Sequence, residues 1–308
     1  MEEKKTNTRI IKIRKIVFRT IIVLFLLILI LGITLSFPTV QTKIAHYFTE
    51  KFNKDFGTNI YIDQVEITIF GGVQLKKVMI KDDHKDTLIY ANRINTSILD
   101  AKKLIEGKLI FGKITANNLT LKIKTYKNDK DSNLDKFVAA FDDGKKSSGK
   151  FLMTTNKIKL IDSRFVKIDE NAKVQKEVDF TRLNAIVTNF KIIGPNVTTF
   201  IDAMSFYDHR GLTVENLTSK FTYTKKNIRL NELDLRTASS RFNGDVVLNY
   251  NMDNKDFSDF NNRVVFDIKT KSAAIATNDI RYFYNELAKD QKFDFKGIVK
   301  GTLNDFKI

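Results

Sequence analysis

The sequence predicts a mostly β protein, in which an N-terminal transmembrane helix precedes an elongated, curled antiparallel sheet with a few short amphipathic helices. Three observations support this prediction. An uncharged apolar run lies near the N-terminus, and apolar and polar residues alternate with a period of two through most of the remaining chain. Gly and Pro are scarce, at 13 and 2 of 308 residues, whereas the strand-favouring residues Ile, Val, Phe, Tyr and Thr recur.

The apolar run is long enough to cross a bilayer. No charged residue occurs from Thr20 to Thr42, and about 20 helical residues span the roughly 30 Å hydrocarbon core. We therefore expect a transmembrane anchor over residues 20–38. A cleaved signal peptide is the alternative, since Thr34-Leu35-Ser36 resembles a cleavage site. The residues assigned to the membrane are Ile21, Leu24, Phe25, Leu27, Ile28, Leu31 and Leu35.

A basic leader, residues 1–19, precedes the anchor. It carries +5 of the net charge of +16, and the positive-inside rule then places the N-terminus in the cytoplasm and the bulk of the chain across the membrane. The remaining positive charge is spread over the expected strands. No arginine-rich helix or aromatic ribonucleoprotein motif accompanies it, so we do not expect nucleic acid as a partner.

Residues 39–56 predict an amphipathic helix, and Gly57 is placed to end it. Its apolar stripe could lie on the membrane surface beside the anchor or could pack against the sheet and close its end. We expect the second arrangement, because an apolar stripe beside a sheet usually packs on it. The stripe consists of Val40, Ile44, Tyr47, Phe48, Phe52 and Phe56.

Alternating runs predict a first β segment over 57–141 and a second over 151–308, with a polar linker, DDGKKSSGK, at 142–150. In each run one parity is apolar and the other is polar, so each strand has one apolar and one wet face. The apolar parities that we expect to line one face are Val65, Ile67, Ile69, Leu119, Leu121, Ile123, Leu217, Phe221, Tyr223, Val246, Leu248, Tyr250, Val264, Phe266, Ile268, Phe293, Phe295, Val299 and Leu303.

The alternation favours an antiparallel sheet, because parallel sheets buried on both faces show continuous apolar runs instead. It does not distinguish a sandwich, a closed barrel and a long sheet curled into a groove. Short helices are predicted at Asn133–Phe141, Val197–Met204 and Asn278–Leu287, the last with Asn278 as its N-cap. The final run still alternates at its end, so we expect an edge open to pairing and a truncated second segment.

Residues that could carry chemistry are few. The absence of Cys excludes disulfides, thiolate metal sites and cysteine nucleophiles, and His46, His84 and His209 fit no paired metal-site spacing. Asp82, Asp83, His84 and Asp86 could hold a cation, but the Gly and Glu of a calcium loop are missing and we expect a solvated turn. The sequence therefore predicts neither an enzyme nor a cofactor or metal site.

Four segments carry a family resemblance. They are FPTVQTKIAHYFTEKFNKDFGTNIYIDQVEITIFGGVQLKKVMIKDDHKDTLIYANRI (37–94), LIEGKLIFGKITANNLTLKI (104–123), SSRFNGDVVLNY (239–250) and FDFKGIVKGTLNDFKI (293–308). Together with the anchor, they resemble the N-terminal region of TamB/AsmA-like proteins of the translocation and assembly module, in particular the long forms of Bacteroidota. The resemblance rests on alternation and small motifs and not on a catalytic signature.

The resemblance implies a repeating β-groove, which is a long, twisted, taco-shaped antiparallel sheet with an apolar interior. It also implies a single-pass inner-membrane protein whose bulk is periplasmic and whose partners are the membrane and phospholipids moved toward the outer membrane. Assistance in outer-membrane protein assembly, with the assembly proteins as partners, is the alternative. Independently of the family, a sheet with one apolar face and few helices must bury that face on another sheet, as in an ordinary core, or on a ligand.

Overall fold

A computed structural model provides the structure of the chain. It describes residues 37–307 apart from 69–71, 98, 100–102, 104–107, 141–151, 172–177, 195, 253–255 and 283–286. The leader 1–19 and the predicted membrane residues from Ile21 to Leu35 lie outside the described residues. No helix among those that are described combines the length and the apolar character needed to cross a bilayer.

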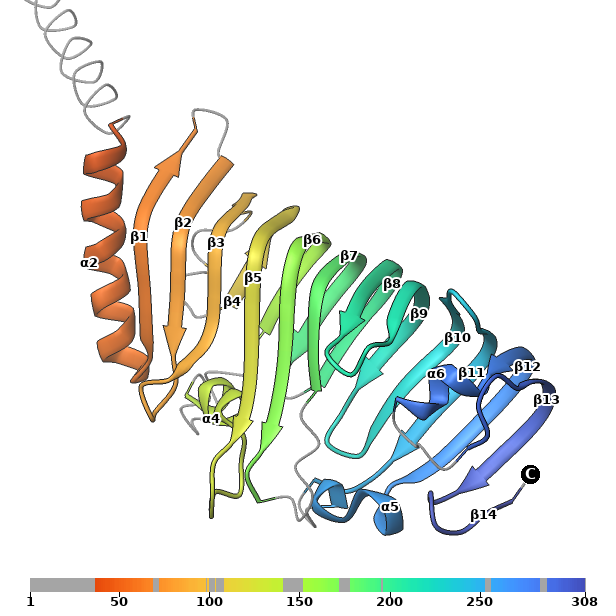
Figure 1. The fold of residues 1–308 in the computed structure, drawn as a ribbon. Coiled ribbons are helices and arrows are strands. Elements are labelled where there is room, and N and C mark those ends of the chain that lie inside the picture. The colour runs from red at the N-terminus through yellow and green to blue at the C-terminus, as the bar shows by residue number, and fades with distance from the viewer. Residues whose placement is uncertain are drawn as a thin grey trace, which may run out of the picture.

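The described residues form one 14-stranded open sheet, and its strand order follows the chain (Figure 1). β4 lies beside this path and pairs with β6. Of the three predicted shapes, the open sheet is the one observed, because the two ends of this strand order do not pair with each other. The strands are β1 (Asn59–Ile67), β2 (Gly72–Lys81), β3 (Thr87–Ser97), β4 (Lys108–Phe111), β5 (Ile114–Thr125), β6 (Leu152–Asp169), β7 (Val178–Ile193), β8 (Asn196–Asp208), β9 (Thr213–Tyr223), β10 (Asn227–Thr237), β11 (Arg241–Asn249), β12 (Val265–Ala276), β13 (Lys292–Gly301) and β14 (Phe306–Lys307).

Most neighbouring strands are antiparallel, but β6 runs parallel to β4 and β5. The expectation of a purely antiparallel sheet is therefore wrong at this point. A parallel pair needs a crossover connection, and the chain between β5 and β6 includes helix α4 (Asn133–Ala139). The predicted linker 142–150 lies outside the described residues, and the strands on either side of it belong to the same sheet.

Residues with positive φ interrupt several strands. They occur inside β2, β5, β6, β7 and β10, at Lys77, Asn118, Asp162, Arg182 and Glu232. At the last three, the register with a neighbouring strand also shifts, as it does at a β-bulge. Asn118 Nδ2 donates to Asp162 Oδ2 across the parallel pair at 3.2 Å, so two of the positive-φ residues lie side by side. Because a bulge bends its strand and increases its twist, the bulges contribute to the curvature seen in Figure 1.

Two of the predicted helices are observed close to their expected bounds. Helix α2 (Pro38–Phe56) ends at Gly57, which has the left-handed conformation (φ 64°) of a C-cap. It lies along β1 at one end of the sheet (Figure 1), which confirms that this helix covers the sheet end. Helix α4 begins at the predicted Asn133 and extends to Ala139.

Other helix predictions are corrected. The segment Val197–Met204 belongs to β8, because pairing with β7 and β9 outweighs the weak helical spacing of its apolar residues. Helix α6 (Thr277–Arg281) has Ala276 as its N-cap and not Asn278, and it ends well before Leu287. The remaining short elements are η1 (Asp256–Asp259) and α5 (Phe260–Arg263), which lead into β12.

Candidate functional site: an apolar sheet face

A row of apolar side chains crosses the whole sheet. Residues directly opposite each other on paired strands project from the same face, so the strand register shows which side chains lie together. We call one chain of such partners, from β1 to β13, the transverse row. Its members are Val65, Leu75, Ile94, Ala116, Leu160, Ala185, Met204, Leu217, Leu235, Phe242, Ala273 and Phe295.

Two further rows lie beside it. Leu217, Phe221 and Tyr223 of β9 are separated by even numbers of residues, so their rows share one face, which we call the apolar face. One row consists of Leu109, Met153, Ile192, Val197, Tyr223, Ile228, Leu248 and Phe266. The other consists of Phe221, Leu230, Val246, Ile268 and Val299.

The structure brings most of the sequence-predicted face residues into these or adjoining pairs. Val65, Leu217 and Phe295 belong to the transverse row, and seven others belong to the two further rows. Five more of the predicted residues lie opposite other residues on neighbouring strands: Ile67 opposite Val73, Leu119 opposite Ala91, Leu121 opposite Ile89, Ile123 opposite Lys167, and Phe293 opposite Ile275.

Four predicted residues lie elsewhere. Ile69 is outside the described residues. Tyr250, Val264 and Leu303 adjoin β11, β12 and β13 and are not part of these strands. Val264 is 0% exposed, so it cannot contact a ligand in this conformation.

Large side chains of the apolar face remain partly exposed. Leu217, Phe221, Leu248 and Phe266 are half-buried, whereas members of a closed core are shielded from water almost completely. The fully buried members of the transverse row are small or β-branched: Val65, Ala116, Ala185 and Ala273. The apolar face is therefore accessible to a molecule large enough to cover it.

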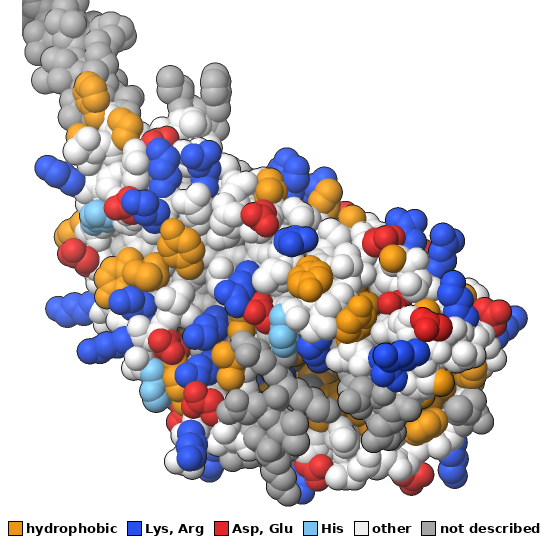
Figure 2. All heavy atoms as spheres, viewed as in Figure 1, with side chains coloured by type: hydrophobic (Ala, Val, Ile, Leu, Met, Phe, Trp, Pro, Cys, Tyr) orange, Lys and Arg blue, Asp and Glu red, His pale blue; other side chains and the backbone are white. Residues whose placement is uncertain are grey.

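The opposite face is polar. The row that alternates with those above contains Thr154, Lys191, Thr198, Thr222, Arg229, Val247, Asp267 and Lys300. Cross-strand ion pairs add to this surface, with Lys76 Nζ 2.7 Å from Glu66 Oε1 and Lys220 Nζ 2.6 Å from Glu232 Oε1. Figure 2 shows basic and acidic side chains dispersed over the visible surface. Only one side of the sheet is thus suited to an apolar ligand.

Polar groups interrupt the apolar face near α4. Lys167 pairs with Ile123 and Val178 on the adjacent strands, and burial lowers the pKa of its ammonium against the opposing effect of Asp169 and Asp135. Burial, with a contribution from Asp135, also raises the pKa of Tyr223 to about 12. The apolar face therefore has a lysine and a tyrosine within electrostatic reach of Asp135 of α4.

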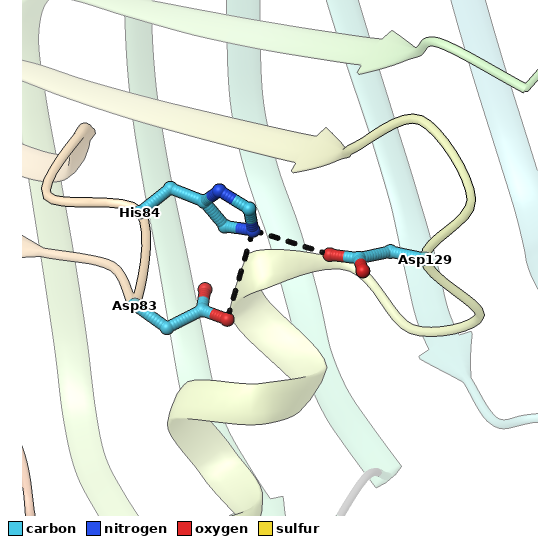
Figure 3. Close-up of side chains that lie close together, drawn as sticks. All are labelled: Asp83, His84 and Asp129. Carbon is cyan, nitrogen blue, oxygen red and sulfur yellow. Dashed lines mark ion pairs between the residues drawn. The ribbon is translucent and has the colours of Figure 1, made fainter.

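The acidic cluster at the β2–β3 turn is a second candidate site. In Figure 3, the ring of His84 points between Asp83 and Asp129, with Nε2 3.8 Å and 3.4 Å from their carboxylates. Lys136 Nζ lies 2.7 Å from each of the same carboxylates. The hydrogen bond between Lys136 and Asp129 lowers the pKa of Asp129 and raises the pKa of Lys136. Because the ammonium already balances the acids, we assign the cluster a structural role.

The same turn contains a buried carboxylate that the sequence did not indicate. Asp82 is 4% exposed, so the expected solvated turn is wrong for this residue. It accepts hydrogen bonds from the Asp86 amide (2.9 Å), from the Tyr126 hydroxyl (2.8 Å) and from Asn133 Nδ2 (2.9 Å). His84 stacks on Tyr126 with ring centroids 3.8 Å apart. These contacts join the turn to β5 and α4 across 44 and 51 residues of sequence.

Comparison of the chain with models of protein families and with curated proteins finds no match.

Proposed function

We propose that this protein is a non-enzymatic, inner-membrane-anchored lipid carrier. The apolar face of its open sheet holds the acyl chains of phospholipids, which pass along the face through the periplasm toward the outer membrane. The resemblance to TamB/AsmA-like proteins supports this proposal, since the repeating β-groove expected of that family requires an open sheet with one apolar face.

The single observation that carries the proposal is the transverse row. It runs without a polar member from β1, which lies beside α2, to β13 at the other end of the sheet. A ligand on such a face would meet apolar side chains at each strand. Burial of apolar surface is worth about 25 cal/mol per Å², or roughly 0.8 kcal/mol for each buried CH₂ group, so acyl chains suit this face.

Lipid selection is expected to be weak in this mechanism. An apolar row contacts acyl chains and leaves the headgroup outside, and acyl chains differ little among phospholipids. Movement along the face would then follow a concentration gradient or depend on partner proteins.

A photocrosslinking experiment tests the proposal. Benzoylphenylalanine replaces Leu248 on the apolar face or Val247, its neighbour on the opposite face, in the full chain produced in a bacterium. A phospholipid adduct at position 248 and none at 247 supports lipid transport. Absence of a lipid adduct at 248, and at Leu121 as a second position, would refute it.

A substitution experiment measures the consequence for transport. Leu248→Arg and Phe266→Asp should each abolish the lipid adduct at a probe on Phe295 of β13 while the chain stays folded. Both side chains are half-buried, so a charge there can reach water, and lipid from the inner membrane meets β11 and β12 before β13. Val247→Arg is the matched control and should leave the adduct intact. Unfolding of both apolar-face variants, measured by circular dichroism, would instead indicate an ordinary core.

A second candidate function is that of a periplasmic scaffold for outer-membrane protein assembly. The observation that favours it is that, within the part of the chain that the structure describes, β13 pairs with β14 only at Lys300 and Gly301. A free strand edge can bind an extended peptide by strand addition. Crosslinking of an outer-membrane protein to a probe at Ile298 of β13, without lipid at Leu248, would favour this function.

A further inference from the structure

Helix α2 contacts the sheet through its polar side. Gln41 Nε2 donates to the carbonyl of Ile67 (3.1 Å) and Gln41 Oε1 accepts from the amide of the same residue (2.6 Å). Twelve residues later, Asn53 forms the equivalent pair with Ile60, at 2.8 Å and 2.9 Å. The contacts run in opposite order along helix and strand, so α2 lies antiparallel to β1 over the length of that strand.

Thr42 completes this arrangement. Its hydroxyl accepts from the amide of Val65 (3.0 Å) and donates to the carbonyl of the same residue (3.2 Å). Side chains of α2 thus replace the strand that would otherwise pair with β1. The hydrogen bonds with the sheet are made by polar side chains. The expectation that the whole apolar stripe packs there is wrong for Ile44 and Tyr47, which are exposed, whereas Val40, Phe52 and Phe56 of the stripe are half-buried.

Apolar side chains are exposed on the remaining circumference of α2. Phe37, Ile44 and Tyr47 are 57%, 41% and 65% exposed, and their spacings of seven and three place them on one side of the helix. Lys43 and Lys51, both exposed, flank this stripe. We call Phe37, Ile44 and Tyr47, with the two lysines, the outer stripe.

We infer that the outer stripe of α2 lies on the surface of a lipid bilayer. Aromatic and aliphatic residues beside lysines are typical of helices that rest at the membrane interface, and the lysines suit anionic headgroups. The uncharged run from Thr20 to Thr42 extends into α2, which brings the outer stripe next to the membrane segment that the sequence predicts. A bilayer is therefore the nearest apolar phase for these side chains.

The start of α2 permits this placement. Phe37 is extended (φ −74°, ψ 126°) and Pro38 occupies the first turn, so a new helix begins here with its own direction. An α2 that lies flat on the membrane sets β1 and its neighbours parallel to the surface. The transverse row then leads away from the bilayer, at about 4.8 Å per strand, or roughly 50 Å from β1 to β13. This placement follows from the packing of α2 and does not require lipid on the apolar face.

Fluorescence quenching tests this inference. The chain has no Cys, so a single cysteine can be introduced and labelled with bimane at Ile44, Tyr47, Thr49 or Ile298 of the full chain. The labelled proteins are reconstituted into vesicles of phosphatidylethanolamine and phosphatidylglycerol with a fraction of doxyl-labelled phosphatidylcholine. We expect loss of fluorescence at positions 44 and 47, little at the half-buried Thr49, whose spacings of five and two from these residues place it on another side of α2, and none at Ile298 on β13.

Two outcomes would overturn the inference. One is the absence of quenching at both 44 and 47. The other is quenching that declines steadily along α2 without regard to helix face, which would mean that the helix stands away from the membrane. Quenching at 44 and 47 without lipid adducts at Leu248 would support the placement of α2 while refuting lipid transport, so the two proposals can fail separately.

Discussion

The two edges of the sheet are protected in different ways. At the β1 edge, α2 supplies amide and hydroxyl groups that pair with the strand backbone. At the other edge, β13 pairs with β14 at only two positions and carries Lys292, Lys296 and Lys300. Lysines on an edge strand disfavour pairing with other chains but leave the backbone accessible. The difference teaches that specific side-chain contacts close the β1 edge, whereas among the described residues only the short strand β14 pairs with the outer edge of β13.

The amides of Gln41 and Asn53 are effective because each has one donor and one acceptor in the arrangement of a peptide group. Each therefore satisfies both hydrogen-bonding groups of one β1 residue. A second polar anchor, the network of Asp82, Tyr126 and Asn133, holds the strand ends of the same region. The side chains of α2 thus hold the edge strand β1, and the Asp82 network holds the β2–β3 turn against β5 and α4.

The largest effect is expected when the covered edge is opened. The double substitution Gln41→Leu, Asn53→Leu leaves the backbone groups of Ile67 and Ile60 without these partners, at about 1–3 kcal/mol for each site. The two sites are roughly 18 Å apart along α2, so the effects should add to about 2–6 kcal/mol of unfolding free energy. Urea denaturation measures the loss, with Glu50→Gln as an exposed control on the same helix. A double variant as stable as the control would contradict our account of this edge.

Loss of the polar network should have an intermediate effect. Tyr126→Phe removes the hydroxyl that donates to Asp82 and Asp86, which should cost about 1–3 kcal/mol because Asp82 stays buried. Burial and these two carboxylates raise the pKa of the Tyr126 phenol. The folded state therefore keeps this proton above about pH 10, where an unfolded tyrosine loses it. The contribution of Tyr126 to the free energy of unfolding is fully present below that pH and is lost as the pH rises further. The Phe variant should show a shallower fall, measured by thermal melting between pH 9 and 11.

A smaller difference is expected in the unmodified protein. The amides of Ile60, Val65 and Ile67 donate to side chains of α2, so they should exchange with deuterium more slowly than those amides of residues 292–299 that face away from β12. Hydrogen exchange followed by mass spectrometry compares the two edges directly. Equal rates would mean that the side-chain contacts do not close the β1 edge.

The smallest effect concerns the exposed cluster of Figure 3. Lys136→Met removes the ammonium that lowers the pKa of Asp129, so the pKa of that carboxyl should rise toward its usual value. The ionised Asp129 carboxylate stabilises the folded state at pH values above the pKa of an unfolded Asp. This stabilisation is lost as the pH falls through the pKa of Asp129 in the folded state. NMR titration of the Asp129 carboxyl measures the shift. An unchanged pKa would show that His84 and not Lys136 dominates the cluster.

The sequence contains a local pattern that marks where several strands bend. Consecutive polar residues interrupt the alternation at Lys76-Lys77, Asn117-Asn118 and Asn231-Glu232, and the second residue of each pair has positive φ. A residue with positive φ shifts the apolar parity of its strand, so two polar residues between apolar ones mark its position. The bend could therefore have been predicted strand by strand, although its alignment across the sheet could not.

The sequence by itself determined the β class, the apolar parity of most strands, and the helices that begin at Pro38 and Asn133, because period and capping are local properties of the chain. Only the tertiary structure decided that the sheet is open, that Val197–Met204 is a strand and that β6 runs parallel to β5, since strand pairing depends on partners far apart in sequence. It also decided which side of α2 faces β1. The amphipathic pattern suggested the apolar side, but an uncovered strand edge needs hydrogen-bonding groups, and the polar residues of α2 supply them.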